Sequence, residues 1–507
     1  GVTLKQGNNS TVPGTQGAGT YSGATDGILA SAAQGTGLSN YAITYAPGTL
    51  TINKATLTVT ADDKTRVYGD TNPSLTYSIT GYLNSQDATS AGITGAPTIS
   101  TTATASSNVT TYAITSAAND LAAANYQFSY VDGTLTINRR PVTVTADNKT
   151  RVYGDANPVL TFAVATDGAG TSRGMYNSQT LSGAVTTTAG SSTNVGNVSI
   201  TQGTVTNTDN ANYDITYNNG TLAITARPIT LTATDRTKVY GDALTLGTSA
   251  FTKTAGTYAN SEVATAVTLT SVNGYAASTT RVVGTNANEV VATNATGTGG
   301  FLESNYDITY VSGSLAITAR PITLTATDRT KVYGDALTLD TSAFTKTAGT
   351  YANSELATAV TLTSVNGYAA STTRVVGTNA NEVVATNATG TGGFLASNYD
   401  ITYVSGSLEI TQKALTITSD ARSTTYGTAL VLGTTNFTEV GLINGDSITG
   451  VTLKQGNNST VPGTQGAGTY SGATDGILAS AAQGTGLSNY DITYVPVSYT
   501  HLTLPTN

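Results

Sequence analysis

His501 is the only histidine among the 507 residues, and the chain has no cysteine. Imidazole and thiolate side chains are the usual general bases, activated nucleophiles and zinc ligands of proteins. Their scarcity therefore argues against acid–base catalysis, nucleophilic catalysis and zinc binding. Serine and threonine are abundant, but a hydroxyl nucleophile needs a general base beside it. We therefore predict no catalytic, cofactor-binding or metal-ligating residues, and no enzyme activity.

The Tyr-Gly-Asp motif, as at Tyr240, Gly241 and Asp242, is the strongest remaining candidate for chemistry. A tyrosine beside a carboxylate could serve as an acid–base pair or as part of a carboxylate site. A structural interpretation also fits, in which Gly241 takes a left-handed turn, Tyr240 packs inward and Asp242 caps the loop backbone. The motif recurs along the chain, and its last copy has Thr428 in place of the aspartate. We therefore favour the structural interpretation.

Carboxylates gather near two of these motifs, at Asp62, Asp63 and Asp70 and at Asp235 and Asp242. Calcium takes about six to eight oxygen ligands, and an EF-type loop would alternate aspartates and end in glutamate. The chain lacks that pattern. Calcium at the junctions between repeats is the one cofactor that the sequence leaves open.

Three glycine-rich stretches, residues 14–23, 294–301 and 387–394, raise the question of a phosphate-binding loop. Such a loop ends in Gly-Lys-Ser/Thr and joins a strand to a helix, and these stretches have neither feature. We expect all three stretches to be flexible loops.

The composition is that of an acidic, strand-forming chain. It has 54 Gly, 28 Tyr, 7 Phe and no Trp, with 10% charged residues and a net charge of −8. Thr, Val and Tyr favour strands, and acidity without a basic cluster argues against binding to nucleic acid or anionic membranes. No stretch approaches the roughly 18 apolar residues of a membrane-spanning helix. The lack of cysteine fits either a cytosolic protein or a large exported chain.

The chain is a tandem array of repeats, which we call modules 1 to 6. Residues 226–318 and 319–411 match at an offset of 93 with four differences, and residues 1–45 recur as 450–494 with one difference. The predicted organisation is a truncated module 1 (1–53), module 2 (54–138), module 3 (139–225), module 4 (226–318), module 5 (319–411), a truncated module 6 (412–496) and a tail (497–507).

Each complete module has a strand-like opening, a Tyr-Gly pair, a variable middle, an Asn-Tyr pair and a closing segment such as NYDITYVSGSLAIT. Tyr306, Ile308 and Tyr310 share one face by the alternation of a strand, and the glycine of VSG predicts a closing hairpin. We predict an all-β module of the immunoglobulin-like sandwich type. A β-grasp-like sheet with one short helix is the alternative, and LNSQDATS (83–90) is the segment expected to form a helical turn.

The connection between modules has a constant length. The last leucine of each closing segment lies 7 residues before the first apolar residue of the next module. The apolar residues have even numbers up to Ile224 and odd numbers from Ile229 onward, so the alternation is interrupted between the two modules. The adjoining strands are therefore separate, and a constant short linker predicts a stiff, monomeric rod. With a radius of gyration of about 12 Å per module, six modules would reach on the order of 150–200 Å.

The repeat predicts what should follow Tyr494, and the agreement stops after Pro496. Residues 45–54 read YAPGTLTINK, whereas residues 494–503 read YVPVSYTHLT. Residues 497–507 match no module and closely resemble the in-frame translation of a transposase-type sequencing adapter. We interpret them as an adapter-derived tail, which would leave the rest of the chain without histidine.

Modules 2 and 3 also resemble a known family. The segments ATLTVTADDKTRVYGDTNPSLTYSITGYLNSQDA (55–88), NYQFSYVDGTLTIN (125–138) and RPVTVTADNKTRVYGDANPVLTF (140–162) resemble the MBG and YDG repeats of large bacterial surface proteins. The resemblance covers residues 1–496. It implies part of a filamentous haemagglutinin-like adhesin that is secreted or held at the cell surface.

The resemblance implies a passive mechanical role, and our leading hypothesis is a stalk that holds a binding tip away from the cell. The alternative is that the modules themselves bind glycans or a host protein multivalently through their variable middle loops. These loops, such as TKTAGTYANSEVATA (252–266), are mostly small and polar, which favours the stalk. The expected partners are host or biofilm glycans or proteins, without nucleic acid or membrane insertion.

Overall fold

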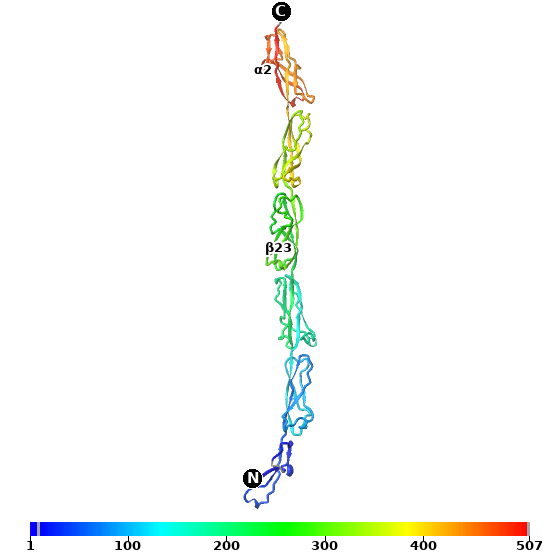
Figure 1. The fold of residues 1–507 in the computed structure, drawn as a ribbon, viewed down its shortest axis with the longest axis vertical. Helices are drawn as coiled ribbons and strands as arrows, with labels where there is room; N and C mark the ends of the chain where they lie inside the picture. Colours follow the sequence, from blue (N-terminus) through cyan, green and yellow to red (C-terminus); the bar gives the residue numbers. More distant parts are fainter. Residues whose placement is uncertain (8–10, 504–507) are drawn as a thin grey trace. The chain divides into compact units, whose positions relative to one another are not determined.

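The computed structural model describes residues 1–7 and 11–503. Strands make up about half of the chain and helices about 5%, which confirms the prediction of an all-β tandem array. Figure 1 draws the modules as strands joined by loops, with each module in its own interval of the sequence colours. The described residues form two units, of which the first holds residues 1–228 with 258–262 and 304–307, and the second holds the rest.

Module 5 shows the plan of the complete modules. Its elements are β26 (Arg320–Ala326), β27 (Arg329–Val332), β28 (Phe344–Gly349), β29 (Leu356–Ser364), β30 (Gly377–Thr391), η4 (Ala396–Asn398), β31 (Tyr399–Val404) and β32 (Gly406–Thr411). They form a three-stranded sheet in the order β28-β26-β31 and a four-stranded sheet in the order β27-β32-β30-β29. Strand β26 of the first sheet contacts β30 of the second, so the module is a two-layered sandwich.

Modules 2, 3, 4 and 6 repeat the opening and closing strands of this plan and differ in the variable middle, whereas module 1 has counterparts of middle and closing strands only. Module 1 contains β1 (Thr3–Gln6), β2 (Gly19–Tyr21), α1 (Gly23–Asp26), β3 (Ile28–Ser31), η1 (Leu38–Asn40) and β4 (Leu50–Ile52). Module 2 contains β5 (Ala55–Ala61), β6 (Lys64–Val67), β7 (Tyr77–Thr80), β8 (Thr98–Ser100), β9 (Thr111–Ala117), β10 (Tyr126–Val131) and β11 (Gly133–Asn138). Module 3 contains β12 (Arg140–Ala146), β13 (Lys149–Val152), β14 (Phe162–Val164), η2 (Tyr176–Ser178), β15 (Thr186–Thr187), β16 (Gly196–Thr201), β17 (Tyr213–Asn218) and β18 (Gly220–Thr225).

Modules 4 and 6 complete the series. Module 4 contains β19 (Arg227–Ala233), β20 (Arg236–Val239), β21 (Phe251–Gly256), β22 (Val263–Ser271), β23 (Gly284–Thr298), η3 (Glu303–Asn305), β24 (Tyr306–Val311) and β25 (Gly313–Thr318). Module 6 contains β33 (Lys413–Ser419), β34 (Arg422–Thr425), β35 (Leu430–Val431), β36 (Phe437–Val440), β37 (Ser447–Gln455), β38 (Thr460–Val461), β39 (Gly468–Tyr470), α2 (Gly472–Asp475), β40 (Ile477–Thr485), η5 (Leu487–Asn489), β41 (Tyr490–Val495) and β42 (Tyr499–Leu502).

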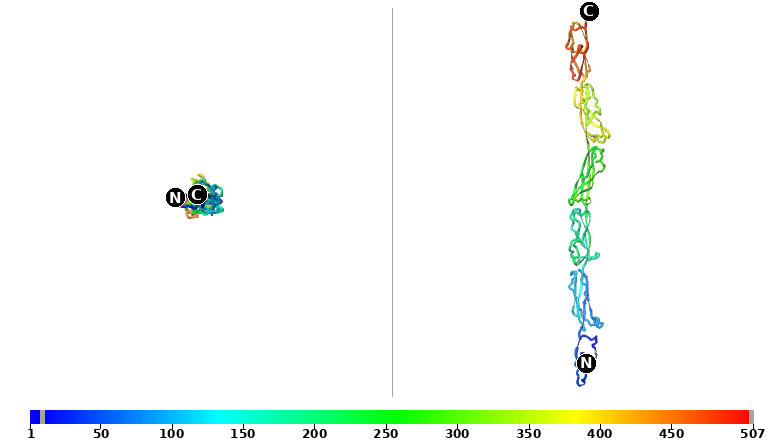
Figure 2. Two further views of the ribbon diagram at one scale, coloured as in Figure 1. Left: turned by 90° about the horizontal axis from the view of Figure 1, so that it is seen from below. Right: turned by 90° about the vertical axis from the view of Figure 1, so that its left-hand side faces the viewer.

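Two parallel strand pairs form the spine of modules 2, 3, 5 and 6. In module 5, Arg320 pairs with Tyr399 in one sheet, and Arg329 pairs with Leu408 in the other. In each pair the two partners are 79 residues apart in the sequence. The opening segment (β26 and β27) and the closing segment (β31 and β32) therefore run side by side. Each passes from the first sheet to the second, and the register between them stays the same in both sheets. The variable middle leaves this register unchanged, and a side view in Figure 2 shows long strands running side by side in the complete modules.

The predicted closing hairpin is wrong. Strands β31 and β32 are separated only by Ser405, yet they belong to different sheets and do not pair with each other. Gly406 is needed at this point because a Cβ atom there would lie 2.6 Å from the carbonyl oxygen of Ala326. The glycine of VSG thus marks a close crossing between layers and not the reversal of a turn.

An Asp or Asn side chain supports the crossing. Asp328 Oδ1 accepts a hydrogen bond from the backbone N–H of Ser407 at 2.6 Å. Where the chain crosses between sheets, a backbone N–H has no acceptor on a neighbouring strand and needs a side-chain acceptor instead. The equivalent bonds join Asp63 to Thr134, Asn148 to Thr221 and Asp235 to Ser314.

The sandwich layers agree with the immunoglobulin-like prediction, but the strand order does not. Immunoglobulin domains pair their strands antiparallel, whereas the first and last segments of these modules pair in parallel. The helical turn predicted at LNSQDATS is confirmed only for the second half of that segment, where the backbone N–H of Ala91 donates to the backbone oxygen of Asp87 at 2.8 Å; in the first half, Asn84 and Ser85 have φ values of 56° and 58°. Left-handed backbone of this kind is incompatible with an α-helix. Among the described residues, no helix is both long and apolar enough to span a membrane.

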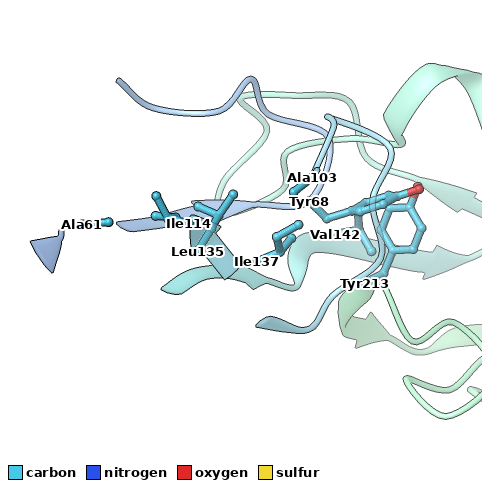
Figure 3. Close-up of a cluster of buried hydrophobic side chains, with 8 residues drawn as sticks. All are labelled: Ala61, Tyr68, Ala103, Ile114, Leu135, Ile137, Val142 and Tyr213. Carbon is cyan, nitrogen blue, oxygen red and sulfur yellow. The ribbon is translucent and has the colours of Figure 1, made fainter. Parts of the chain in front are cut away.

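Each module core lies between its sheets and continues to the module end. Leu135 and Ile137 of β11 are buried against Ile114 of β9 in module 2, and Tyr68 lies in the same cluster. Figure 3 shows the ring of Tyr68 beside that of Tyr213, which belongs to module 3. The core of one module therefore passes into the start of the next.

The tail supplies the last strand of module 6. Residues 499–502 form β42, which pairs in parallel with β34 and antiparallel with β39. His501 takes the position of Ile52 in module 1, of Ile137 in module 2 and of Ile410 in module 5, and it is only 1% exposed. No described residue forms a hydrogen bond with either of its ring nitrogens. A buried, unpartnered imidazole is poorly suited to this core position, and it is not placed for catalysis.

Candidate functional site at the module junctions

The Tyr-Gly-Asp motif lies at the end of each complete module and contacts the next one. Gly241 has a φ of 87°, which confirms the predicted left-handed turn. A Cβ atom on Gly241 would lie 2.3 Å from the Cβ atom of Ala352 in module 5. Glycine is therefore needed both for its backbone conformation and for the close approach of the neighbouring module.

Tyr240 packs inward, as predicted, but its contacts are with the next module. Its side chain is 3% exposed, and its ring meets that of Tyr399 edge to face at a centroid distance of 5.8 Å. Tyr399 is the tyrosine of the Asn-Tyr pair of module 5. Equivalent ring pairs join Tyr68 to Tyr213, Tyr153 to Tyr306 and Tyr333 to Tyr490.

One side chain accepts hydrogen bonds from both tyrosines of the pair. Glu355 is 3% exposed, and its two carboxylate oxygens lie 2.5 Å from Tyr240 Oη and 2.7 Å from Tyr399 Oη. The same arrangement recurs with Glu262 between Tyr153 and Tyr306, and with Asp446 between Tyr333 and Tyr490. At the junction of modules 2 and 3, Gln179 Oε1 accepts from Tyr213 at 2.6 Å, while its Nε2 donates to Tyr68 at 3.1 Å.

A left-handed turn positions this bridging residue. Asn353 and Ser354 have φ values of 52° and 61°, and Asn353 Nδ2 donates to the backbone oxygen of Thr279 at 2.9 Å. Asparagine tolerates this conformation better than most residues. The sequences at the five equivalent positions are NSQ, NSQ, NSE, NSE and NGD, ending at Gln86, Gln179, Glu262, Glu355 and Asp446. Sequence reasoning missed this recurrent Asn-Ser/Gly-acid/amide pattern, although it was visible in the repeats.

Burial, followed by the hydrogen bond to Glu355, raises the pKa of Tyr240 and that of Tyr399. Both phenols therefore remain protonated donors through the physiological range. Hydrogen bonds to a carboxylate are shorter and stronger than those between neutral groups. The cluster is thus a fixed polar contact and not a proton-transfer pair.

The aspartate of the motif has a different role from the one predicted. Asp242 forms an ion pair with Arg320, the first residue of β26, instead of capping its own loop. Arg320 Nε also donates to the backbone oxygen of Tyr240 at 2.7 Å. Arg227 joins Asp155 and Tyr153 in the same way at the preceding junction.

The asparagine of each Asn-Tyr pair makes a third contact across the junction. Asn398 Oδ1 accepts from the backbone N–H of Val283 at 3.2 Å. Equivalent bonds link Asn125 to Ala18, Asn212 to Val109, Asn305 to Val195 and Asn489 to Val376. Both sequence landmarks of the modules are therefore junction residues.

The carboxylates considered for calcium have protein partners. Asp62 accepts from Thr76 and Asp63 from the backbone of Thr134, while Asp70 pairs with Arg173. Asp235 accepts from the backbone of Ser314 at 2.6 Å. The described residues contain no group of three or more His, Cys, Asp or Glu side chains that could hold a metal ion.

The middle of modules 4 and 5 contains buried charges that sequence reasoning missed. Lys331 Nζ donates to the backbone oxygens of Tyr368, Ala369 and Ser371 at 2.5, 3.1 and 2.5 Å. Glu382 accepts from the backbone and side chain of Asn366. Burial alone would raise the pKa of Glu382, but hydrogen bonds from Ser364 and Asn366 outweigh it and lower that pKa. These groups hold the loop between β29 and β30 in place.

The glycine-rich stretches differ from the expected loops. Residues 294–298 belong to β23 and residues 387–391 belong to β30, so most of these two stretches is strand. Strand β23 accommodates these residues through irregular register with β22, and Asn294 has a φ of 50°. Gly297 of this strand is needed for close packing, because a Cβ atom there would lie 2.1 Å from the backbone oxygen of Val263.

The comparison with protein families agrees with the junction motif. Residues 57–136 and 142–223 match the family model described as MBG domain (YGX type). Residues 57–223 therefore carry two MBG domains in tandem. Each matched segment contains its Tyr-Gly pair, at Tyr68 and at Tyr153.

A comparison with curated protein sequences found none that matches the chain. MBG repeat domains are not known as enzymes, and they occur in surface adhesin-like proteins. The family therefore suggests an adhesin-like repeat region. Modules 4 and 5 share the sheet order of the two matched MBG domains.

Proposed function

We propose that this MBG array is the stalk of a secreted or cell-surface bacterial adhesin, in which it holds a binding tip away from the cell. The resemblance to filamentous haemagglutinin-like adhesins supports this role. The observation that carries the proposal is the recurrence of one buried junction. In it, the Tyr-Gly end of one module and the Asn-Tyr pair of the next share a single hydrogen-bond acceptor.

Three separate contacts fix each such junction. At the junction of modules 4 and 5, Glu355 joins two tyrosines, Arg320 joins Asp242, and Asn398 binds the backbone of Val283. Directional bonds at three points restrict both bending and rotation, which loosely tethered domains do not achieve. A spacer needs this property, because a flexible chain would let the tip fold back toward the cell.

Small-angle scattering on the chain at low concentration tests the proposal, with and without calcium. The stalk predicts an elongated profile that calcium does not change. A profile typical of flexibly linked domains would contradict it. A profile that extends only when calcium is added would show that the carboxylate loops are ion sites and that rigidity comes from the metal.

One observation favours a second function, binding through the modules themselves. The guanidinium carbon of Arg281 lies 4.2 Å from the centre of the Tyr275 ring, and Arg374 covers Tyr368 at the same distance in module 5. A half-buried aromatic–arginine pair at one loop in two copies could contact a glycan or protein with avidity. Glycan-array binding of the chain and of a Y275A/Y368A variant tests this function, and equal signals from both would reject it.

A further inference from the structure

Module 2 contains an open cleft of about 490 Å³ beside strand β7. The phenol rings of Tyr77 and Tyr82 line it, together with the aliphatic side chains of Ile79, Ala88 and Ile93. Tyr77 is 39% exposed, and Tyr82 is half-buried. None of the described residues that line the cleft is charged. The cleft therefore presents aromatic and aliphatic surface to the solvent.

The ring of Tyr82 has a counterpart in module 5. Tyr82 meets Tyr126, the tyrosine of its Asn-Tyr pair, edge to face at a centroid distance of 6.4 Å. Tyr351 meets Tyr399, the tyrosine of the corresponding pair, in the same way at 6.0 Å. Tyr82 and Tyr351 also both stand four residues before the bridging glutamine or glutamate. The surroundings of these two rings can therefore be compared directly.

In module 5, a lysine ammonium lies over this ring. Lys346 Nζ is 5.8 Å from the centre of the Tyr351 ring and donates to the backbone oxygen of Gly349 at 2.6 Å. A cation over an aromatic face is attracted by the negative charge of that face. The counterpart of Lys346 in module 2 is Ile79, since both are the third residue of the strand that pairs with the opening strand. Module 2 therefore keeps the ring but lacks the cation.

A second neighbour of the ring also differs between the two modules. In module 5, Phe394 meets Tyr351 edge to face at a centroid distance of 6.1 Å. Phe394 stands four residues before the asparagine of the Asn-Tyr pair, and Leu121 has that position in module 2. Tyr82 thus lacks two side chains that Tyr351 has beside it, a lysine and a phenylalanine.

Carboxylates stand at the rim of the cleft. Burial and then the charge of Asp87 raise the pKa of Tyr82, whereas hydrogen bonds from Ser90 lower the pKa of Asp87 and keep it ionised. Asp120 lies beside Gly95, a lining residue, where a Cβ atom would be 2.8 Å from Asp120 Oδ1. The acidic residue at position 87 is peculiar to module 2, since its counterparts in modules 3 to 6 are uncharged: Thr180, Val263, Leu356 and Ser447.

We propose that the cleft of module 2 binds a choline-type quaternary ammonium cation, which takes the place over Tyr82 that Lys346 takes over Tyr351. Such a cation needs no hydrogen-bond acceptor, and its methyl groups match the side chains of Ile79 and Ile93. Aromatic rings recognise quaternary ammonium groups in this way, and the acidic rim adds attraction. A stalk needs no ligand, so this site is a function beyond the proposed one.

Saturation-transfer NMR on the whole chain with choline chloride tests the proposal. We expect a dissociation constant on the order of 1 mM, because the ligand is small and the cleft is open. The neutral isostere 3,3-dimethyl-1-butanol should bind at least about tenfold more weakly, since it lacks the charge. Phosphocholine should also bind more weakly than choline, because its phosphate would approach Asp87. Equal binding of choline and the alcohol, or tighter binding of phosphocholine, would overturn the proposal.

Two substitutions taken from sister modules locate the site. Met175 has the position of Tyr82 in module 3, and Lys346 has that of Ile79 in module 5. Y82M removes the ring and I79K covers it with a lysine, so each should weaken choline binding at least about tenfold. V159K is the matched control for charge, since Val159 is 82% exposed and lies in module 3; it should change the affinity by less than about twofold. Choline binding that is unchanged in Y82M or I79K, or absent at about 20 mM choline, would show that the cleft is not a cation site.

Discussion

The bridging carboxylate of the junction gives the sharpest test, through the substitutions Glu355→Ala and Glu355→Gln. Glu355 accepts from Tyr240 at 2.5 Å and from Tyr399 at 2.7 Å, and it is almost fully buried. Alanine leaves two buried hydroxyl groups without their acceptor. Each such group costs about 1–3 kcal/mol, so E355A should weaken the junction by about 2–6 kcal/mol.

Glutamine is the matched control, because the chain already uses it at an equivalent position. Gln179 accepts from Tyr213 and donates to Tyr68 at the junction of modules 2 and 3. E355Q can make the same two bonds, so we expect a change within about 1 kcal/mol.

Hydrogen-exchange mass spectrometry on the chain measures the effect locally. A loss of 2 kcal/mol should speed exchange about 30-fold in peptides around Tyr240 and Ala352, whose backbone N–H donates to Tyr399 Oη. The other junctions should remain unchanged in the same sample. Equal protection in E355A and E355Q would refute the conclusion that the bridging acceptor holds the modules together.

Four further predictions concern modules 4 to 6. Gly241→Ala should destabilise the junction of modules 4 and 5 by about 2 kcal/mol or more, whereas Gly247→Ala should destabilise the chain by only about 1 kcal/mol. Both losses are measured as changes in the free energy of unfolding by urea. Both glycines have positive φ, but only Gly241 has a neighbouring atom where a Cβ would lie; equal losses would show that close approach is irrelevant. His501→Ile should protect module 6 from proteolysis, with a gain of about 2 kcal/mol, and faster cleavage would contradict its assigned core position. Burial and the hydrogen bond to Asp446 raise the pKa of Tyr490 to about 12, so its contribution to stability is present below about pH 10 and lost as the pH rises through about 12. The lowered pKa of Glu382 has the opposite sign, with stability present above about pH 4.3 and lost as the pH falls through the folded value. Urea midpoints across pH, compared with those of Y490F and E382Q, check both directions.

The sequence was sufficient for the strand content and the landmarks of the modules. Alternation at Tyr306, Ile308 and Tyr310 correctly indicated which side chains face the core, since Tyr306 is buried while Asp307 and Thr309 are exposed. The change of parity at the junctions correctly separated the strands on either side, for example β18 and β19. These features depend on local periodicity, which a single sequence displays.

The pairing of strands could not be predicted from local periodicity. A glycine between two strand-like runs fits both a hairpin and a crossing between sheets, and only the parallel partner about 70–80 residues away decides between them. Asp328 carries a signal of the crossing, because its carboxylate accepts from Ser407, but an aspartate before a strand has many other meanings.

The junction was missed because its members lie far apart in the chain. Tyr240 and Glu355 are separated by 115 residues and belong to different modules. The Tyr-Gly and Asn-Tyr pairs were recognised as landmarks of single modules, whereas their contacts are made between modules. The recurrence of NSQ, NSE and NGD, all with left-handed backbone in the structure, was the available clue.

The distance between spin labels on either side of one junction tests the central claim most directly. Val272 and Val365 are equivalent, 62% exposed positions in modules 4 and 5, and the chain has no cysteine to interfere with labelling. Pulsed electron resonance on the doubly labelled V272C/V365C chain measures the distribution of that distance. A fixed junction predicts one narrow distribution, which broadens in E355A and not in E355Q. A distribution that is already broad with Glu355 in place would contradict the conclusion that this cluster locks successive modules together.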